Sequence, residues 1–261
     1  MIRRTHLATQ ATDFAVLDIQ WSPHVPHSSP VLAVAASTGL IAIYRLDVTK
    51  QATGLIFLCQ HIIAKPSILV LSIAWHPSDP NILGFTLSDG TVGIAKTKEG
   101  SNWTNKTAVE ITELHRHELE AWTLAFTHED PTQVISGGDD SVLQCSDVGG
   151  TGAVAPMWKT RKLHEAGVTA ILPLTSNLLL TGSYDDRIRL ISHQARGRPQ
   201  SLLDCNLGGG VWRLKLLHGS DHSVRIDEPR PQRYACSSDV TMGATRDSSE
   251  QYWRTGNLTV S

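Results

Sequence analysis

Short segments of alternating apolar and polar residues recur along most of the chain at a nearly constant interval. Each recurrence has a small residue, a turn residue and then apolar residues at every second position, which is typical of a half-buried β-strand after a tight turn. The four copies cover residues 37–44, 88–95, 139–146 and 184–191. Their second residues, Thr38, Asp89, Asp140 and Asp185, are separated by 51, 51 and 45 residues. This interval indicates a repeat fold in which each repeat is one supersecondary unit.

A second apolar segment precedes each copy. These segments cover residues 16–23, 70–77, 121–126 and 168–173, and a fifth, 211–216, has no copy after it. They are rich in β-branched and aromatic residues and are bounded by turn residues, and no helical periodicity extends beyond two turns. The sequence therefore predicts an all-β propeller over residues 1–218, with four four-stranded antiparallel blades, the start of a fifth and an incomplete ring. Residues 219–261 are rich in Ser, Arg, Asp and Pro, and we expect an irregular polar tail that completes no blade.

The repeat resembles the blades of WD-repeat propellers. The resemblance is carried by the small-x-Asp turn, by the alternating strand after it and by His117, nine residues before Phe126. It departs at the positions of the signature Trp, which hold Tyr44, Ala95, Ser146 and Ile191. An Asp in the tight turn can accept a hydrogen bond from the histidine of its blade, which ties the outer loop to the inner strands. We expect His117 to pair with Asp140 and His164 with Asp185. The pattern favours a structural role for these four residues, with a catalytic role as the alternative.

Five segments resemble a particular family, the diphthine methylesterases. They cover residues 117–122, 136–140, 164–168, 181–185 and 209–215, and their order and spacing match the family as well as their residues do. The resemblance implies an enzyme, a carboxylic ester hydrolase, that removes the methyl ester from methylated diphthine, the modified histidine of translation elongation factor 2. It implies elongation factor 2 as the partner. After Lys215 the sequence departs from the family, which continues with further blades.

The predicted blades place a set of aromatic and acidic residues on one face of the ring. The loop into the first strand and the turn before the third strand open on the same face, where blades one and two present Leu69, Leu71 and Ser88. Blades three to five instead present Glu120, Trp122, Asp139, Tyr184, Gly210 and Trp212. Ring faces and carboxylates both attract a cation that cannot donate hydrogen bonds. Trp122, Tyr184, Trp212 and Gly210 are therefore the candidate substrate-binding residues, and the trimethylammonium of diphthine is a suitable ligand. Each of these aromatics is alternatively a packing residue against a neighbouring blade.

Ester hydrolysis needs an activated nucleophile and a place for the oxyanion. The sequence has no G-x-S-x-G elbow, no H-E-x-x-H motif and no Cys/His metal spacing, so water activated by a carboxylate or a histidine is the simplest mechanism, without cofactor or metal. The candidate catalytic residues are Asp139, Glu120 and His117. The backbone amides of residues 208–210 are a candidate anion site. The alternative function is a non-catalytic scaffold that binds a basic or methylated peptide.

Composition narrows the partners and the compartment. The 23 Lys and Arg residues against 25 Asp and Glu give a net charge of −2, which provides no field to hold nucleic acid or an anionic membrane. The longest apolar run, around residues 68–75, is too short to span a bilayer. Four widely spaced cysteines without a C-x-x-C pair, and a start without a secretory signal, indicate reduced thiols. We expect a cytoplasmic monomer.

Overall fold

The computed structural model describes residues 9–23, 29–48, 53–97, 103, 109–127, 132–148, 156–194, 197–215, 240–245 and 254–260. Every regular element in these residues is a β-strand, which confirms the predicted all-β class. No helix long and apolar enough to cross a membrane occurs in the same residues.

Sixteen of the strands form four antiparallel sheets of four, which are the predicted blades. Blade one contains β1 (Val16–Trp21), β2 (Val31–Ala36), β3 (Leu40–Val48) and β4 (Thr53–Ile62). Blade two contains β5 (Val70–Trp75), β6 (Ile82–Leu87), β7 (Thr91–Thr97) and β8 (Val109–Arg116). Blade three contains β9 (Ala121–Phe126), β10 (Gln133–Gly138), β11 (Leu143–Asp147) and β12 (Pro156–Thr160). Blade four contains β13 (Val168–Pro173), β14 (Leu178–Ser183), β15 (Arg187–Ser192) and β16 (Gln200–Asn206).

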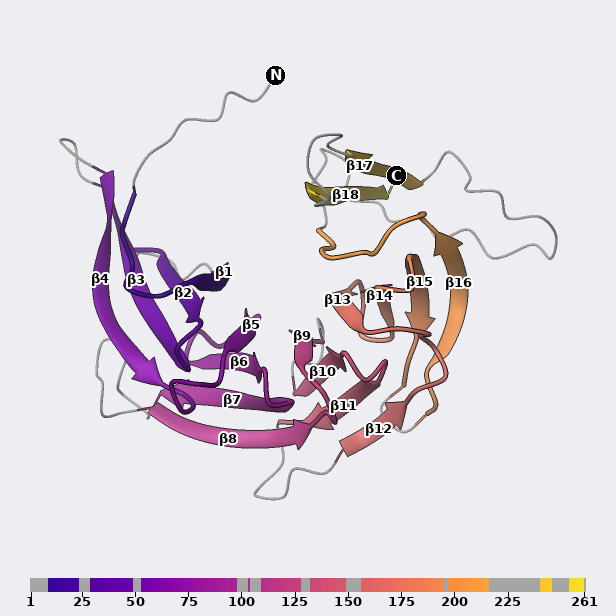
Figure 1. The fold of residues 1–261 in the computed structure, drawn as a ribbon, viewed down its shortest axis with the longest axis horizontal. Helices are drawn as coiled ribbons and strands as arrows, with labels where there is room; N and C mark the ends of the chain where they lie inside the picture. Colours follow the sequence, from indigo (N-terminus) through magenta and orange to yellow (C-terminus); the bar gives the residue numbers. More distant parts are fainter. Residues whose placement is uncertain are drawn as a thin grey trace.

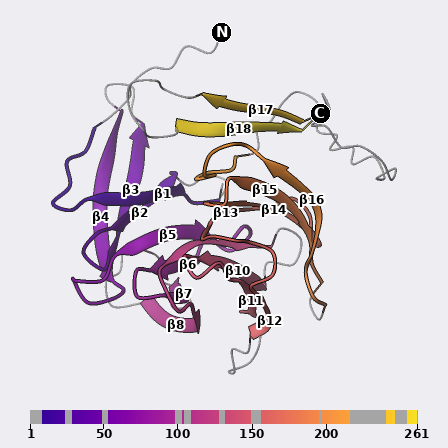
Figure 2. The same ribbon diagram turned by 45° about the vertical axis from the view of Figure 1, so that its right-hand side comes forward.

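The blades stand side by side in an arc. The first strands β1, β5, β9 and β13 line its centre, and the fourth strands β4, β8, β12 and β16 form its rim (Figures 1 and 2). The four repeat residues Thr38, Asp89, Asp140 and Asp185 all lie in the turn between the second and third strands of their blades, as the spacing predicts.

Apolar side chains between successive blades make up most of the core. Ile41 and Ile43 of blade one pack with Phe85 and Leu83 of blade two, and corresponding clusters join blade two to three and blade three to four. Each blade is therefore stabilised by its neighbours, as expected of a repeat whose unit cannot bury its own apolar face.

The predicted first strand of a fifth blade is not a strand in the structure. Residues 211–215 have no regular secondary structure, because no strand among the described residues pairs with them. Val211 nevertheless occupies on blade four the place that Val168 occupies on blade three: a Cβ on Gly182 would collide with Val211, and one on Gly137 with Val168. The segment thus begins where the next blade of a propeller would begin.

The tail differs in part from the irregular segment that the sequence predicts. β17 (Val240–Thr245) and β18 (Arg254–Val260) pair as an antiparallel two-stranded sheet. Both segments contain Thr and Val, whose branched side chains favour extended backbone. The expected boundary at residue 218 lies outside the described residues and stays a prediction.

Candidate functional site

Three aromatic rings from three successive repeat units meet on one face of the arc. Trp122 lies on β9, Tyr184 in the turn between β14 and β15, and Trp212 in the segment after β16. The ring centroids of Tyr184 and Trp212 are 4.9 Å apart, and Trp122 lies 6.4 Å from Tyr184 and 6.3 Å from Trp212. All three pairs are edge-to-face. The structure thus brings the three predicted aromatics together, and Trp212 stays 46% exposed.

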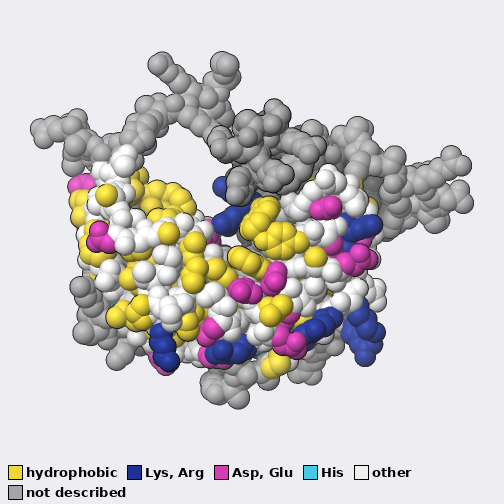
Figure 3. Space-filling view, in the orientation of Figure 1, with side chains coloured by type: hydrophobic (Ala, Val, Ile, Leu, Met, Phe, Trp, Pro, Cys, Tyr) yellow, Lys and Arg dark blue, Asp and Glu magenta, His cyan; other side chains and the backbone are white. Residues whose placement is uncertain are grey.

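An acidic side chain lies directly beside these rings. The indole Nε1 of Trp122 donates a hydrogen bond to Asp139 Oδ1 at 3.1 Å. Burial raises the pKa of the Tyr184 hydroxyl, and the nearby charge of Asp139 raises it further. We call Trp122, Asp139, Tyr184 and Trp212 the aromatic-acid site. Hydrophobic and acidic side chains lie close together on the face drawn in Figure 3.

Two glycines make room at the aromatic-acid site. A Cβ on Gly167 would lie 2.7 Å from Asp139 Oδ1 and 3.1 Å from Tyr184 Cδ2, so a side chain there would separate Asp139 from Tyr184. The predicted Gly210 lies on the other side of Tyr184, with its missing Cβ 3.4 Å from Tyr184 Cδ1. Gly167 therefore lets Asp139 approach the ring, a role that the sequence pattern alone did not indicate.

The second predicted acid, Glu120, is fixed through its backbone. The amide of Asp139 donates to the Glu120 carbonyl at 2.8 Å, which holds the loop before β9 against the turn after β10. The Glu120 carboxylate makes no hydrogen bond or ion pair with any other described residue. The structure therefore holds the backbone of Glu120 against that of Asp139.

The third candidate, His117, is fully buried beneath this loop. Its Nδ1 donates to Asp140 Oδ1 at 2.9 Å, which confirms the predicted pairing, and its Nε2 lies 2.8 Å from Ser136 Oγ. The other oxygen of Asp140 accepts from the Glu118 amide at 3.0 Å. Burial opposes ionisation of Asp140, but the hydrogen bonds from His117 and the backbone outweigh it and lower its pKa to about 2.

Sequence reasoning missed His115, which extends this network. Its Nε2 lies 2.7 Å from Ser136 Oγ and its Nδ1 lies 2.6 Å from Ser146 Oγ. Burial, and then the neighbouring charges of His117 and Lys159, lower the pKa of His115 to about 3. A neutral His115 can accept from Ser146 at Nδ1 and donate to Ser136 from Nε2, so both of its ring nitrogens have a partner. The signal was Ser146, a small polar residue where WD repeats carry Trp.

The predicted pair of His164 and Asp185 does not form. His164 Nε2 lies 2.9 Å from Thr181 Oγ1, and its buried Nδ1 has no partner among the described residues. Asp185 instead forms an ion pair with Arg189 at 2.8 Å and accepts from the Glu165 amide at 2.9 Å. The guanidinium of Arg189 takes the carboxylate oxygen that the histidine would need, which corrects the prediction.

The candidate anion site over residues 208–210 is partly occupied by the chain itself. Gly208 adopts a φ of 72°, and its amide donates to the Asn206 side-chain carbonyl at 2.7 Å. That amide is therefore not available to a ligand. In the part of the chain that the structure describes, no group of three or more His, Cys, Asp or Glu side chains is arranged to hold a metal ion.

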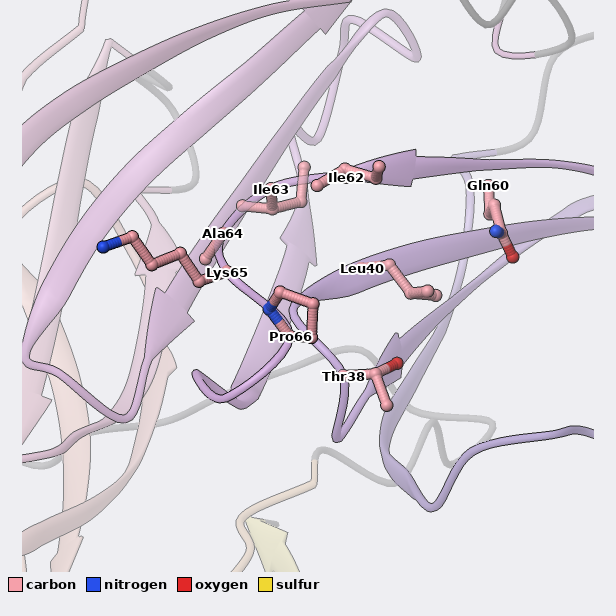
Figure 4. A pocket seen from close by; sticks show the side chains of 8 residues that line it. All are labelled: Thr38, Leu40, Gln60, Ile62, Ile63, Ala64, Lys65 and Pro66. Atoms are coloured by element: carbon pink, nitrogen blue, oxygen red, sulfur yellow. The ribbon is translucent and has the colours of Figure 1, made fainter.

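A separate apolar groove of about 480 Å³ lies on blade one, lined by residues that include Leu40, Ile62 and Pro66. The amine of Lys65 points away from the other lining side chains (Figure 4). Among the described residues that line the groove there is no carboxylate or histidine.

Comparison with known proteins shows a similarity to WD-repeat proteins. A family model for the WD domain, G-beta repeat, matches residues 158–192. Diphthine methyltransferase of Schizosaccharomyces pombe is 33% identical over 214 residues, which cover 81% of this chain and 60% of that protein. Human diphthine methyltransferase is 31% identical over 209 residues, covering 77% of this chain and 44% of that protein. The predicted resemblance is thus confirmed, and the chain spans less than two thirds of the length of these relatives.

Solved structures support the propeller architecture. A chain of the mitotic checkpoint complex aligns with a TM-score of 0.60 at 22% identity, covering 95% of this chain and 66% of that one. Sqt1 of Chaetomium thermophilum, bound to the N-terminus of ribosomal protein L10, aligns with a TM-score of 0.52 at 18% identity. The alignment covers 69% of this chain and 48% of the Sqt1 chain. At these identities the similarity shows the fold alone.

Proposed function

We propose that this chain, a WD-repeat relative of the proteins named diphthine methyltransferase, is a diphthine methylesterase. It hydrolyses the methyl ester of methylated diphthine on elongation factor 2, in the cytoplasm and as a monomer. The observation that carries the proposal is the aromatic-acid site, because its chemistry fits the cationic group of that substrate.

The rings of Trp122, Tyr184 and Trp212 recognise the trimethylammonium group. A quaternary ammonium has no hydrogen to donate, so it is held by the negative faces of aromatic rings and by nearby negative charge. The edge-to-face arrangement of the three rings turns their faces in different directions, and Asp139 lies within hydrogen-bond distance of Trp122. The exposed fraction of Trp212 leaves this wall of the site open to a ligand.

Asp139 and Glu120 are the candidate general bases. One carboxylate accepts a proton from water as the water oxygen attacks the ester carbonyl carbon, and the proton then leaves with the methoxide as methanol. Gly210, beside Tyr184, leaves space for the ester at this position. His117 is a positioning residue in this scheme, because its ring is buried and both nitrogens are engaged, and through Asp140 it holds the loop of residues 118–120.

The test is methanol release from elongation factor 2 that carries methylated diphthine, with the Schizosaccharomyces pombe relative as positive control. Asp139→Asn should lower turnover by about 100-fold or more with little change in KM, since it removes a base but keeps the size and shape of the side chain. Trp122→Ala should weaken substrate binding by about 1 to 2 kcal/mol. Asp47→Asn, an acid on β3 of blade one, is the matched control and should leave both quantities unchanged.

Full esterase activity in both folded variants would remove this face from the mechanism. The alternative, a non-catalytic scaffold that binds a methylated or basic peptide at the same site, predicts binding that depends on Trp122 without any methanol release. The same assay therefore separates the two functions.

A further inference from the structure

A buried carboxylate in the first blade gathers donors from two other parts of the chain. Asp18 lies on β1, and its side chain is only 5% exposed. Its Oδ2 accepts from Ser72 Oγ at 3.1 Å and from the Ile73 amide at 3.0 Å, both on β5. Its Oδ1 accepts from Arg213 Nη1 at 3.2 Å. A carboxylate so removed from water needs such partners, so Asp18 fixes the position of each donor.

The contact between Asp18 and Arg213 crosses the centre of the arc. The two residues are 195 positions apart, one on the first blade and the other in the segment that follows the fourth. Arg213 lines a central channel of about 610 Å³, together with Ser72 of blade two and Thr169 of blade four. The segment of residues 211–215 has no strand partner among the described residues, so it depends on a few individual contacts.

Those contacts flank Trp212 on both sides. Before it, the Val211 amide donates to the Ser183 carbonyl at 3.0 Å, and the Val211 carbonyl accepts from Thr169 Oγ1. After it, Arg213 is held by Asp18. Trp212 itself is 46% exposed and touches Tyr184 and Trp122 only through ring edges and faces. Its orientation in the aromatic-acid site therefore depends on how its two neighbours are anchored.

We propose that Asp18 and Arg213 form a positioning pair that holds Trp212 in the aromatic-acid site and so sets the affinity of that site for a quaternary ammonium. The inference rests on the proposed function. Without the pair, the residue directly after Trp212 loses its anchor, and the nearest remaining contact on that side is the packing of Leu214 against the apolar cluster of blade four. A cation–π contact requires the cation over the ring face, so a ring that samples several orientations binds more weakly.

The experiment measures the dissociation constant of tetramethylammonium chloride by titration of the full chain, with sodium chloride at matched ionic strength as the blank. Arg213→Gln removes the ion pair at a residue that is half exposed, and it should weaken binding by about 3- to 10-fold, the loss expected for a partly disordered cation–π contact. Asp18→Asn should weaken it by a similar factor. Arg213→Lys, which keeps the charge, should recover part of the affinity.

Ser72→Ala is the matched control. It removes another donor to the same carboxylate, but one that joins blade one to blade two and does not reach Trp212. It should lower the melting temperature and leave the dissociation constant within about 2-fold of the original protein, since the Arg213 contact stays. In a Trp212→Ala background, Arg213→Gln should have no further effect on binding, because the ring that it positions is gone.

The outcomes separate this inference from the proposed function. If the unaltered chain does not bind tetramethylammonium, the cation site itself is wrong and this inference falls with it. If the unaltered chain binds but folded Arg213→Gln binds equally well, only the positioning pair is wrong. The same conclusion follows if Arg213→Gln weakens binding equally with and without Trp212.

Discussion

Blades three and four carry the same His and Asp pattern but build different polar networks from it. In blade three the ring of His117 bridges Ser136 and Asp140, and among the described residues no Lys or Arg side chain forms an ion pair with that carboxylate. In blade four, Asp185 forms an ion pair with Arg189 instead, and His164 makes one hydrogen bond, with Thr181. The same turn can therefore be held by a chain of histidine and serine hydrogen bonds or by a buried pair of arginine and aspartate.

The cause lies in two positions on the third strand. Arg189, four residues after Asp185, corresponds to Gln144, four residues after Asp140. The amide of Gln144 donates to the Arg116 carbonyl, at 3.4 Å, and leaves Asp140 to the histidine. Two residues later, Ser146 in blade three offers a hydroxyl to His115, whereas blade four has Ile191, which packs into the core. A single charged residue thus decides which partner the turn carboxylate takes.

The largest effect is expected at the ion pair of blade four. Arg189→Met should lower the free energy of unfolding by about 3 to 5 kcal/mol, because Asp185, whose side chain is 4% exposed, would keep its charge without its partner. Arg187→Met is the matched control. Arg187 bonds the same Asp204 as Arg189 does, but its side chain is 37% exposed, and its loss should cost about 0 to 1 kcal/mol.

Urea unfolding of the two variants measures the difference. Equal losses of unfolding free energy in Arg189→Met and Arg187→Met would show that the buried ion pair contributes no more than a surface pair. The difference between the two blades would then have no effect on stability.

The next largest difference in stability is expected between replacements of the two blade histidines, His117 and His164. His117→Ala should destabilise by about 2 to 3 kcal/mol, because it leaves both Ser136 and Asp140 short of a partner inside the protein. His164→Ala should cost about 1 to 2 kcal/mol, because that ring makes one hydrogen bond and already has an unpaired nitrogen. Thermal and urea unfolding give the order, and a larger loss at His164 would contradict it.

A smaller effect on stability is expected at Ser146, at the end of the hydrogen-bond network of blade three. Ser146→Ala removes the hydroxyl that lies 2.6 Å from His115 Nδ1 and should lower stability by about 1 kcal/mol. Ser146→Ala combined with His117→Ala should cost less than the sum of the two, because both belong to one network. Strict additivity in a double-mutant cycle would show that this hydrogen-bond network is not cooperative.

The smallest effect is a change in pH dependence. Burial, and then the charge of Arg189, lower the pKa of His164 to about 4, against about 6.5 for an exposed histidine. The unfolded chain therefore takes up the proton first as the pH falls. The contribution of neutral His164 to the free energy of unfolding is complete above about pH 6.5 and is lost as the pH falls from about 6.5 to 4. His164→Gln should flatten the fall in melting temperature across this interval, and an unchanged slope would place the acid sensitivity elsewhere.

Local pattern determined the blades of this protein. The period of about fifty residues and the two-residue alternation are visible along the sequence itself. The strand class, the turn positions and the convergence of Trp122, Tyr184 and Trp212 on one face could therefore be derived from the sequence. The pairing of His117 with Asp140 follows in the same way, because both residues belong to one repeat.

Tertiary structure decided what depends on contacts between repeats or between competing side chains. Whether Asp185 takes His164 or Arg189 is settled by geometry inside the blade, and the pattern of the chain is the same in both cases. Residues 211–215 have the composition of a strand, but they form no ladder because a strand needs a paired neighbour. The contact of Arg213 with Asp18 joins residues 195 positions apart, and such a contact has no local signature because it depends on how all the intervening blades stack.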